Sequence, residues 1–322
     1  MGDGPRYRDV TKIAVVSRSF ARNATLRAEL SAKYPGASFT ESPEILDGDA
    51  LVAMLRGHDC AIVGLERVND AILAQVPELK IISKYGVGLD RIDVDAIARR
   101  GIKLGWTGGV NKRSVSELTL AFAIALVHRV PETGFALRDG HWLKLVGHQL
   151  SGRTFGVIGC GFVGQDLVTL LAPFDCRVLA HDIRDYPEFY AAHHVTPVGL
   201  YQLLAESDIV SLHVPLDRST KGMIGAGQLS RMRAGTFLIN AARGGLVDEE
   251  ALAEALEGGH LAGAACDVFQ MEPDANSRLL ALPTFLGTPH IGGSTAEAQL
   301  AMGRAAIEGL ETARVPSAEW PA

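Results

Sequence analysis

Short apolar runs alternate with amphipathic segments along most of the chain, and this alternation predicts an α/β fold. The runs are almost continuously apolar, as is typical of strands buried on both faces of a parallel sheet. In the first third of the chain they predict strands at 13–17, 60–64, 80–85 and 102–106. Further along they predict strands at 154–159, 177–182, 209–213, 236–240, 263–268 and 284–287.

Helical patterns lie between these strands, for example at 69–75 and 94–100. A long helix is predicted over 114–138, where Ser114 and Glu117 have the spacing of a capping box. This helix falls between the two series of strands, and we expect it to begin the second of two α/β domains.

The last helical pattern, at 294–311, can return to the first series of strands and close a discontinuous domain. Such an arrangement makes the fold α/β, with two doubly wound parallel-sheet domains. The expected domains are residues 1–107 plus 292–322 and residues 108–291.

Composition and charge exclude several classes of protein. The 322 residues are 47% hydrophobic and 21% charged, an ordinary globular balance. The net charge is −6 with acids and bases interspersed, so we expect neither nucleic acid nor an anionic membrane as a partner. The longest apolar stretch, 118–127, is too short to span a bilayer. No grouping of metal-ligand residue types is evident, and no metal is expected.

Cysteine usage and the N-terminus both favour a cytoplasmic location. The four cysteines form no C-x-x-C pair and lie in apolar surroundings, which is typical of reduced thiols. Residues 1–9 are polar and lack the apolar core of a signal peptide.

The most specific motif is the segment 157–164, VIGCGFVG, in which G-x-G-x-x-G follows an apolar strand. Gly159 allows the tight turn that leaves the strand, and Gly161 leaves room for a pyrophosphate. Gly164 lets the following helix pack closely on the sheet, and the N-terminus of that helix attracts phosphate. The motif therefore predicts a bound dinucleotide.

Asp182, at the end of the next predicted strand, completes the dinucleotide fingerprint. A carboxylate there can accept both ribose hydroxyls and repels a 2′-phosphate, so NAD is favoured over NADP. Arg184 leaves NADP open because an arginine can accommodate that phosphate, although a solvated loop charge explains it as well.

Four further segments carry a resemblance to a known family: LSGRTFG at 150–156, NAARGGLVD at 240–248, DVFQMEP at 267–273 and TPHIGGST at 288–295. In their order and spacing the chain resembles the D-isomer-specific 2-hydroxyacid dehydrogenases over almost its whole length. The resemblance implies a Rossmann-type NAD-binding domain inserted into a flavodoxin-like substrate domain. It also implies NAD-dependent oxidation of a CH–OH group and D-stereochemistry.

Three residues are the expected catalytic group, and the chemistry of a 2-hydroxy acid supports each of them. Arg243 offers a guanidinium fork for the carboxylate and for the forming carbonyl. His290 is the expected acid and base, because imidazole titrates near working pH. Glu272 is expected to pair with His290, to orient it and to raise its pKa. Each residue alone is also explained as an ordinary loop side chain.

The resemblance also implies a set of cofactor contacts beyond the glycines and Asp182. Asp267 is expected to face the nicotinamide, and His213 to line the cofactor without acting as the base. The remaining expected contacts are Phe162, Val163, Pro215, Thr220, Ala241 and Gly292.

A second glycine-rich loop, in the first domain, is expected to hold the substrate carboxylate. It follows Lys84, and glycines at Gly86 and Gly88 free the backbone N–H groups of a tight turn. The resemblance assigns the carboxylate to Gly86, Val87 and Gly88, with Asn111 nearby. A glycine-rich turn without a ligand is the alternative.

Within the family, the chain is most similar to the 3-phosphoglycerate dehydrogenases. A phosphorylated substrate needs further cations, and Arg67, Lys84 and Lys144 are the candidates, although each alone is also explained as a surface charge. The chain stops at Ala322, so the C-terminal regulatory domain of many such enzymes is not expected. A glyoxylate or hydroxypyruvate reductase, or a phosphonate or phosphite dehydrogenase, remains an alternative.

A function of another class is an NAD-sensing corepressor that binds a protein partner. That alternative predicts stoichiometric capture of a partner with no turnover of any 2-hydroxy acid. Family members are usually dimers, and the predicted helix with the segment 135–144 is expected to supply a two-fold interface.

Overall fold

The computed structural model describes residues 12–317. The polar stretch 1–9, which predicts the absence of a signal peptide, lies outside the described residues. Two compact units divide the chain: unit 1 is Met1–Asn111 with Ala296–Ala322, and unit 2 is Lys112–Thr295. The junctions at Asn111 and Thr295 lie slightly later in the sequence than the predicted ones at 107 and 291.

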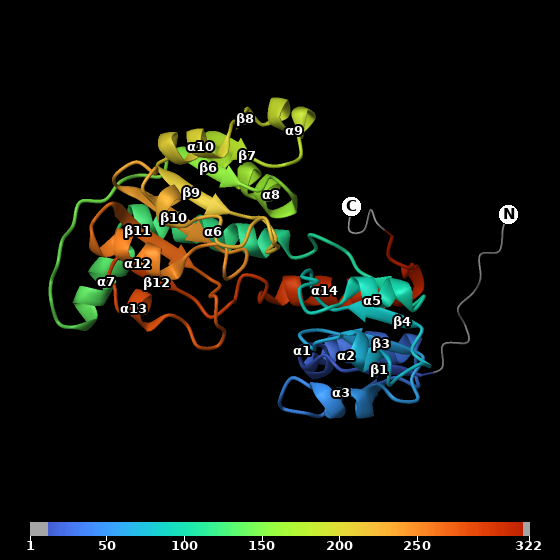
Figure 1. Cartoon of the computed structure of the whole chain (residues 1–322). Coiled ribbons are helices and arrows are strands. Elements are labelled where there is room, and N and C mark those ends of the chain that lie inside the picture. Colours follow the sequence, from blue (N-terminus) through green and yellow to red (C-terminus); the bar gives the residue numbers. More distant parts are fainter. Residues whose placement is uncertain (1–11, 318–322) are drawn as a thin grey trace. The chain divides into compact units, whose positions relative to one another are not determined.

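Unit 1 contains a five-stranded parallel sheet in the order β2-β1-β3-β4-β5 (Figure 1). The direction of winding reverses between β1 and β3, which is the flavodoxin-like order. The strands are β1 (Ile13–Val15), β2 (Ser38–Phe39), β3 (Cys60–Val63), β4 (Ile81–Lys84) and β5 (Lys103–Gly105).

Helices cover both faces of this sheet, because successive strand residues point to opposite sides. Ile13 and Val15 pack with α1, α2 and α14, whereas Ala14 and Val16 pack with α3, α4 and α5. The helices are α1 (Arg18–Arg22), α2 (Ala24–Lys33), α3 (Gly48–Leu55), α4 (Asp70–Leu73), α5 (Val94–Arg99) and α14 (Ala296–Thr312).

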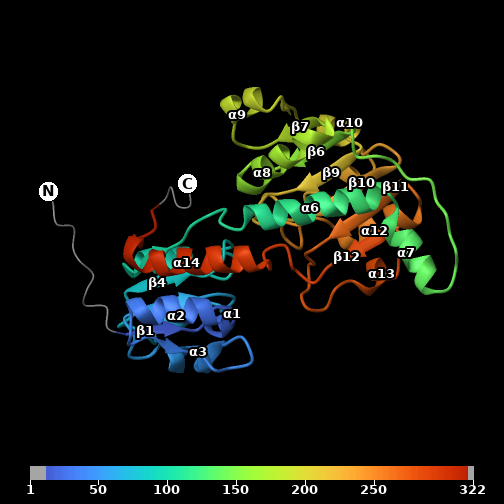
Figure 2. The ribbon, with the colours of Figure 1, turned by 180° about the vertical axis from the view of Figure 1, so that it is seen from behind.

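The last helix, α14, packs against β4 and β5 of unit 1. Both ribbon views show α14 beside β4 (Figure 1, Figure 2). Two glycines allow the close approach. A Cβ on Gly105 would overlap the backbone of Gly309, and a Cβ on Gly309 would overlap the Ser83 hydroxyl. That hydroxyl donates a 2.6 Å hydrogen bond to the carbonyl of Ala306. The helical pattern at 294–311 therefore returns to the first series of strands.

Unit 2 contains a seven-stranded parallel sheet in the order β12-β11-β10-β9-β6-β7-β8. The chain starts in the middle at β6 and winds outwards in both directions, which is the Rossmann order with one added strand. The strands are β6 (Thr154–Ile158), β7 (Arg177–His181), β8 (Thr196–Pro197), β9 (Ile209–Leu212), β10 (Thr236–Asn240), β11 (Leu261–Cys266) and β12 (Phe285–Gly287).

Two helical layers enclose the sheet of unit 2. One layer consists of α6 (Lys112–Val127), α8 (Phe162–Leu171) and α9 (Pro187–Ala192), with the 3₁₀ turn η1 (Ala172–Phe174) after α8. The other layer consists of α10 (Leu200–Glu206), α11 (Ala226–Leu229), α12 (Glu249–Glu257) and α13 (Ser277–Leu280). The predicted class, α/β with two doubly wound parallel sheets, is confirmed.

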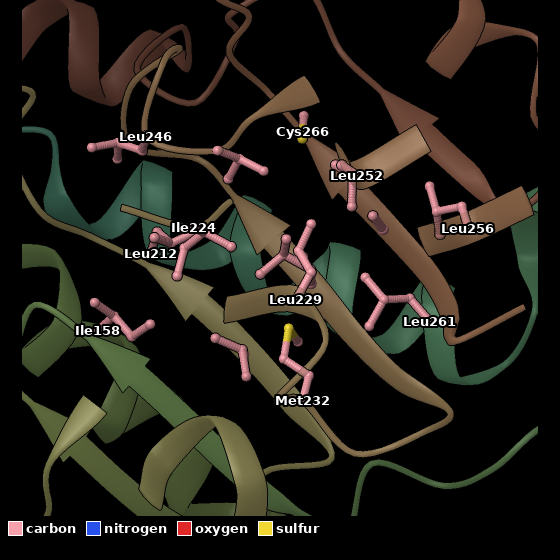
Figure 3. Packing of buried hydrophobic residues seen from close by; sticks show 14 of the residues in the cluster. Ile158, Leu212, Ile224, Leu229, Met232, Leu246, Leu252, Leu256, Leu261 and Cys266 are labelled. Atoms are coloured by element: carbon pink, nitrogen blue, oxygen red, sulfur yellow. The ribbon is translucent and has the colours of Figure 1, made fainter. Parts of the chain in front are cut away.

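Figure 3 shows the apolar packing between the sheet of unit 2 and the second of these helical layers. The cluster includes Leu212 at the end of β9, Leu229 of α11, and Leu252 and Leu256 of α12. Burying one leucine side chain contributes about 1.5–3 kcal/mol. This cluster fixes the strands from which the polar loops of unit 2 emerge.

The long helix predicted over 114–138 is wrong in two respects. It breaks between α6 and α7 (Val130–Arg138), because Arg129 has a left-handed φ of 58° and Pro131 lies in the first turn of a new helix. The predicted capping box at Ser114 is also wrong, since α6 already begins at Lys112 and places Ser114 inside the helix.

In the described part of the chain, no single helix is long and apolar enough to cross a membrane. The pair α6 and α7 reaches that length and composition only together, and it bends by 71° at the break. Residues 12–317 also contain no group of three metal-binding side chains. All four cysteines lie in this part of the chain and are free thiols.

Candidate active site

The polar loops of unit 2 gather at one edge of its sheet. Because all its strands are parallel, their carboxyl ends lie at the same edge, and ligands of such sheets bind there. The glycine loop follows β6, and Asp182 follows β7. Arg243, Glu272 and His290 follow β10, β11 and β12, which are neighbouring strands. The fold therefore collects Asp182, Arg243, Glu272 and His290 at one edge, together with the glycine loop.

The glycine loop fits a dinucleotide. Gly159 has a φ of 93°, and a Cβ there would lie 2.7 Å from the His213 carbonyl carbon. A Cβ on Gly164 would overlap the Gly159 carbonyl, so helix α8 requires glycine to approach the strand. Gly161, by contrast, has open space around it at the start of α8. That open space above a helix N-terminus is what a pyrophosphate needs.

Asp182 lies against the glycine loop. One carboxylate oxygen accepts from the Cys160 N–H at 2.6 Å, and the other accepts from the Arg184 N–H at 2.8 Å. The carboxylate is half-buried, whereas the side chain of Arg184 is exposed. Ionised oxygens fixed beside the turn fit the hydroxyls of a ribose whose phosphates lie at α8.

His213 follows β9 and lies beside the glycine loop. Its Nε2 is 2.9 Å from the Ser211 hydroxyl, and its buried Nδ1 has no hydrogen-bond partner within residues 12–317. Burial lowers the pKa of His213 to about 4, so the ring is neutral near pH 7. A neutral, enclosed imidazole is suited to lining a cofactor and unsuited to donating protons at neutral pH.

The other expected cofactor contacts lie around this edge in different degrees of exposure. The Thr220 hydroxyl donates to the Pro215 carbonyl at 2.7 Å, which closes the loop after His213. Ala241 is buried directly after β10, and the Phe162 side chain is exposed at the start of α8. Val163, in the first turn of α8, is half-buried.

The loop that carries Arg243 is held by hydrogen bonds from side chains to its backbone. Asn240 accepts from the Ala242 N–H at 3.1 Å and donates to the Arg243 carbonyl at 2.9 Å. The guanidinium of Arg243 donates to the Ala242 carbonyl at 2.7 Å. A Cβ on Gly244 would overlap the Phe269 carbonyl, so this loop lies directly against the loop that contains Glu272.

Glu272 and His290 form a pair. The Nδ1 atom of His290 lies 2.8 Å from one Glu272 oxygen, and the other oxygen accepts from the Phe269 N–H at 3.1 Å. The two side chains are 50% and 37% exposed, for His290 and Glu272 respectively. A carboxylate at Nδ1 selects the tautomer with the proton there, which leaves Nε2 to exchange a proton with a ligand.

Asp267 organises the loop that carries His290. It is 1% exposed, and one of its oxygens accepts from the Thr288 hydroxyl and the Ile291 N–H at 2.6 and 2.7 Å. The other oxygen accepts from the Gly292 N–H at 2.7 Å. The structure thus shows Asp267 holding this loop, a function that the strand-end position alone did not reveal.

The predicted glycine turn of unit 1 lies at the carboxyl end of β4. Gly86 has a φ of 114°, which suits the tight turn that was predicted. The Val87 carbonyl accepts from the indole N–H of Trp106 at 2.9 Å, and Gly88 is half-buried. Asn111 is buried at the end of the unit.

The three candidate cations differ sharply in exposure. Lys84 is buried, and its ammonium donates to the carbonyls of Gly64 and Tyr85. Arg67 in unit 1 and Lys144 in unit 2 are exposed. Glu66, which was not among the predicted residues, is 1% exposed and accepts from the Gly64 N–H. An acidic residue in a short polar loop gave no sign of being buried.

Comparison with known proteins agrees with this geometry. Residues 120–292, more than half of the chain, match the family model described as "D-isomer specific 2-hydroxyacid dehydrogenase, NAD binding domain". The match lies within unit 2. Unit 2 is therefore an NAD-binding domain, and NAD is its cofactor.

Similar proteins extend the match into unit 1. The D-3-phosphoglycerate dehydrogenase of Mycobacterium tuberculosis is 38% identical over 270 residues, which are 83% of this chain and 51% of that protein. The hydroxypyruvate reductase of Thermotoga maritima is 37% identical over 275 residues, covering 82% of this chain and 88% of that protein. The chain thus spans about half the length of the phosphoglycerate dehydrogenase that it matches.

A solved structure is similar over nearly the whole chain. The TT0316 protein from Thermus thermophilus superposes with a TM-score of 0.84 at 33% identity, covering 95% of this chain and 99% of that chain. The resemblance inferred from the four sequence segments is confirmed. Its fold, its glycine loop and these relatives place the chain in the family of D-isomer-specific 2-hydroxyacid dehydrogenases.

Proposed function

We propose that the protein is an NAD-dependent dehydrogenase that transfers a hydride between C2 of a D-2-hydroxy acid and NAD. The observation that carries the proposal is the Glu272–His290 pair, 2.8 Å apart, at the sheet edge that also presents the glycine loop and Arg243. A paired imidazole beside a dinucleotide site supplies what a hydride transfer from an alcohol still needs, a group that takes the proton.

In oxidation, the guanidinium of Arg243 holds the substrate carboxylate and polarises the C2 oxygen. Nε2 of His290 takes the hydroxyl proton while Glu272 holds the proton on Nδ1 and stabilises the imidazolium. The C2–H bond breaks with its electron pair and a C=O bond forms; the bound nicotinamide supplies the chemistry that accepts this hydride. In reduction, His290 donates the proton instead.

Asp182 is proposed to select NAD over NADP. Both of its oxygens are fixed by backbone N–H groups beside the turn, so the carboxylate cannot swing away from a 2′-phosphate. Arg184 is proposed to be a solvated charge, since its side chain is exposed. We also assign cofactor contacts to Asp267 and Gly292, which adjoin His290.

The substrate that we propose is D-3-phosphoglycerate, in keeping with the relatives named D-3-phosphoglycerate dehydrogenase. Gly86, Val87 and Gly88 hold the carboxylate in this proposal, and Arg67 and Lys144 approach the phosphate. The test is the initial rate of NADH formation with D-3-phosphoglycerate beside D-glycerate at equal concentration. A large preference for the phosphorylated acid supports the proposal, and equal rates exclude it.

One observation favours a second substrate class, glyoxylate or hydroxypyruvate. The ammonium of Lys84, the buried cation nearest the glycine loop of unit 1, is engaged by two backbone carbonyls. A relative of similar length is named hydroxypyruvate reductase. NADH consumption with hydroxypyruvate and with its 3-phosphate, in the same assay, separates the two substrate classes.

We further propose that the protein is a cytoplasmic homodimer. None of the residues of α7 is buried, and Trp142 and Val146 beyond it are 79% and 89% exposed. Exposed apolar side chains on one helix and its following arm are typical of an interface between copies. Light scattering on the wild type and on W142E/V146E tests this: a dimer that becomes a monomer is expected. A reducing compartment suits the four free thiols.

A further inference from the structure

Ser114 lies inside helix α6, and its hydroxyl bonds to a distant segment of unit 2. The hydroxyl donates to the carbonyl of Gly292 at 2.5 Å, across 178 positions of the chain. Ser114 is 7% exposed, and a Cβ on Gly292 would lie 3.6 Å from Val115 and 3.7 Å from Leu118 of the same helix. Helix α6 therefore carries the end of the loop that presents His290.

The bond continues into a chain of hydrogen bonds. The N–H of Gly292 donates to one oxygen of Asp267, and the Thr288 hydroxyl donates to the other. A Cβ on Gly292 would come within 2.9 Å of the Asp267 carboxylate, so the backbone of Gly292 is packed closely against that carboxylate. Ser114, Gly292, Asp267 and Thr288 thus hold both ends of the segment whose middle residue is His290.

His290 needs this support because its backbone is strained. Its φ is 55°, in the left-handed region that residues with a side chain seldom adopt, and such a residue persists only where its surroundings hold it. The His290 N–H donates to the carbonyls of Asp267 and Thr288 at 2.8 and 3.0 Å. If the Gly292 end of the loop is released, the backbone can relax and turn the imidazole.

Ser114 and its partner Gly292 both lie close to the points where the chain passes between the two units. The chain enters unit 2 at Lys112 and leaves it at Thr295, so Ser114 and Gly292 lie just inside the two connections to unit 1. Their bond ties the two connections together within unit 2.

We propose that Ser114 is a positioning residue for His290: its hydroxyl, through Gly292 and Asp267, keeps the imidazole in the orientation that proton transfer requires. This inference rests on the proposed dehydrogenase function for its kinetic consequence. A small misplacement of an acid–base group lowers the rate of the chemical step more than it weakens binding.

The kinetic test compares S114A with T119V. Thr119 is buried on the same helix, and its hydroxyl donates only to the Val115 carbonyl one turn earlier, at 2.9 Å. We expect S114A to lower kcat roughly tenfold with KM for NAD unchanged, and the deuterium isotope effect on hydride transfer to rise. S114T, which keeps a hydroxyl, is expected to restore most of the rate. Equal kcat in S114A and T119V would overturn the inference.

A second readout needs no turnover. Hydrogen exchange of the peptide 285–295, followed by mass spectrometry in the protein without substrate, reports whether the amides of Ile291 and Gly292 are still held. One lost hydrogen bond is expected to speed their exchange about fivefold in S114A but not in T119V. Unchanged exchange would contradict the positioning role. If the wild-type protein oxidises no 2-hydroxy acid, the proposed function fails, and this exchange experiment decides the positioning role by itself.

Discussion

Two loops at the carboxyl edge of the same sheet each present a histidine, and they do so in opposite ways. His213, after β9, has a buried Nδ1 and a neutral hydroxyl partner, Ser211. His290, after β12, has a half-exposed ring and a carboxylate partner, Glu272. The distance of a histidine from the cofactor loop does not decide its function; its access to water and the charge of its partner do.

The backbones of the two loops differ as well. His213 continues a regular strand and donates its N–H to the carbonyl of Ile158 at 2.7 Å. His290 has a left-handed φ and is held there by hydrogen bonds around Asp267. A strained backbone is typical of positions where a side chain must be held in one orientation, and of these two histidines only His290 has a left-handed φ.

The largest effect is expected at Arg243, the proposed anchor of the substrate carboxylate. R243A removes the fork proposed to hold the carboxylate, and we expect roughly a thousandfold lower kcat/KM with NAD binding retained. R243K keeps the positive charge without the guanidinium fork, and its kcat/KM should lie between the values of the wild type and of R243A. Steady-state kinetics with fluorescence titration of NADH measures both quantities. A loss below tenfold in R243A would remove Arg243 from the substrate site.

A smaller effect is expected from the partner of His290. E272Q keeps the shape of the side chain and removes the negative charge at Nδ1, and we expect about a hundredfold lower kcat. E249Q is the matched control, because Glu249 accepts from the Gln270 N–H of the same loop and is not the hydrogen-bond partner of His290. If both variants lose the same activity, Glu272 acts through the loop alone and the contrast with His213 weakens.

Cofactor choice is expected to change by about tenfold. D182N removes the charge beside the glycine loop and keeps a carbonyl oxygen for the N–H of Cys160 or Arg184, so the ratio of kcat/KM for NAD over NADP should fall. The measurement is the two specificity constants at fixed substrate. An unchanged ratio would show that Asp182 does not meet the ribose.

The smallest effect concerns stability at low pH. The pKa of His213 falls from 6.5 in the unfolded chain to about 4 in the folded one. Between these values the unfolded state binds a proton that the folded state does not, so stability is lost as pH falls. We expect H213N to lose about 2 kcal/mol less unfolding free energy than the wild type between about pH 7 and 4.5. Parallel urea titrations test this, and identical losses would mean that His213 is solvated.

Much of this edge was predictable from the sequence. The fingerprint glycines and Asp182 report local backbone demands, which one stretch of chain can express. All but two of the described strands were predicted, because buried parallel strands are continuously apolar. The two-residue edge strands β2 and β8 were missed, since they are too short to show a pattern.

What the sequence did not reveal depends on contacts between distant segments. The hydroxyl of Ser114 bonds to Gly292 instead of a helix end, and nothing near Ser114 in the chain records that partner. Asp267 was expected to contact the cofactor, and its carboxylate also accepts hydrogen bonds from the backbone of the loop that carries His290. Lys84 was predicted to be a cation available to a phosphate, whereas the carbonyl of Gly64 engages it. Each depends on packing that propensity and spacing do not encode.

His290, and not His213, is proposed to be the acid–base group, and the most direct test compares H290N with H213N. Both variants are assayed for NAD affinity by titration and for turnover of the best 2-hydroxy acid. We expect H290N to bind NAD as the wild type does and to lose about a thousandfold in kcat. H213N is expected to keep at least about a tenth of the wild-type kcat, because a ring that is neutral near pH 7 takes no part in proton transfer. The opposite ranking, with H213N inactive and H290N active, would contradict the account.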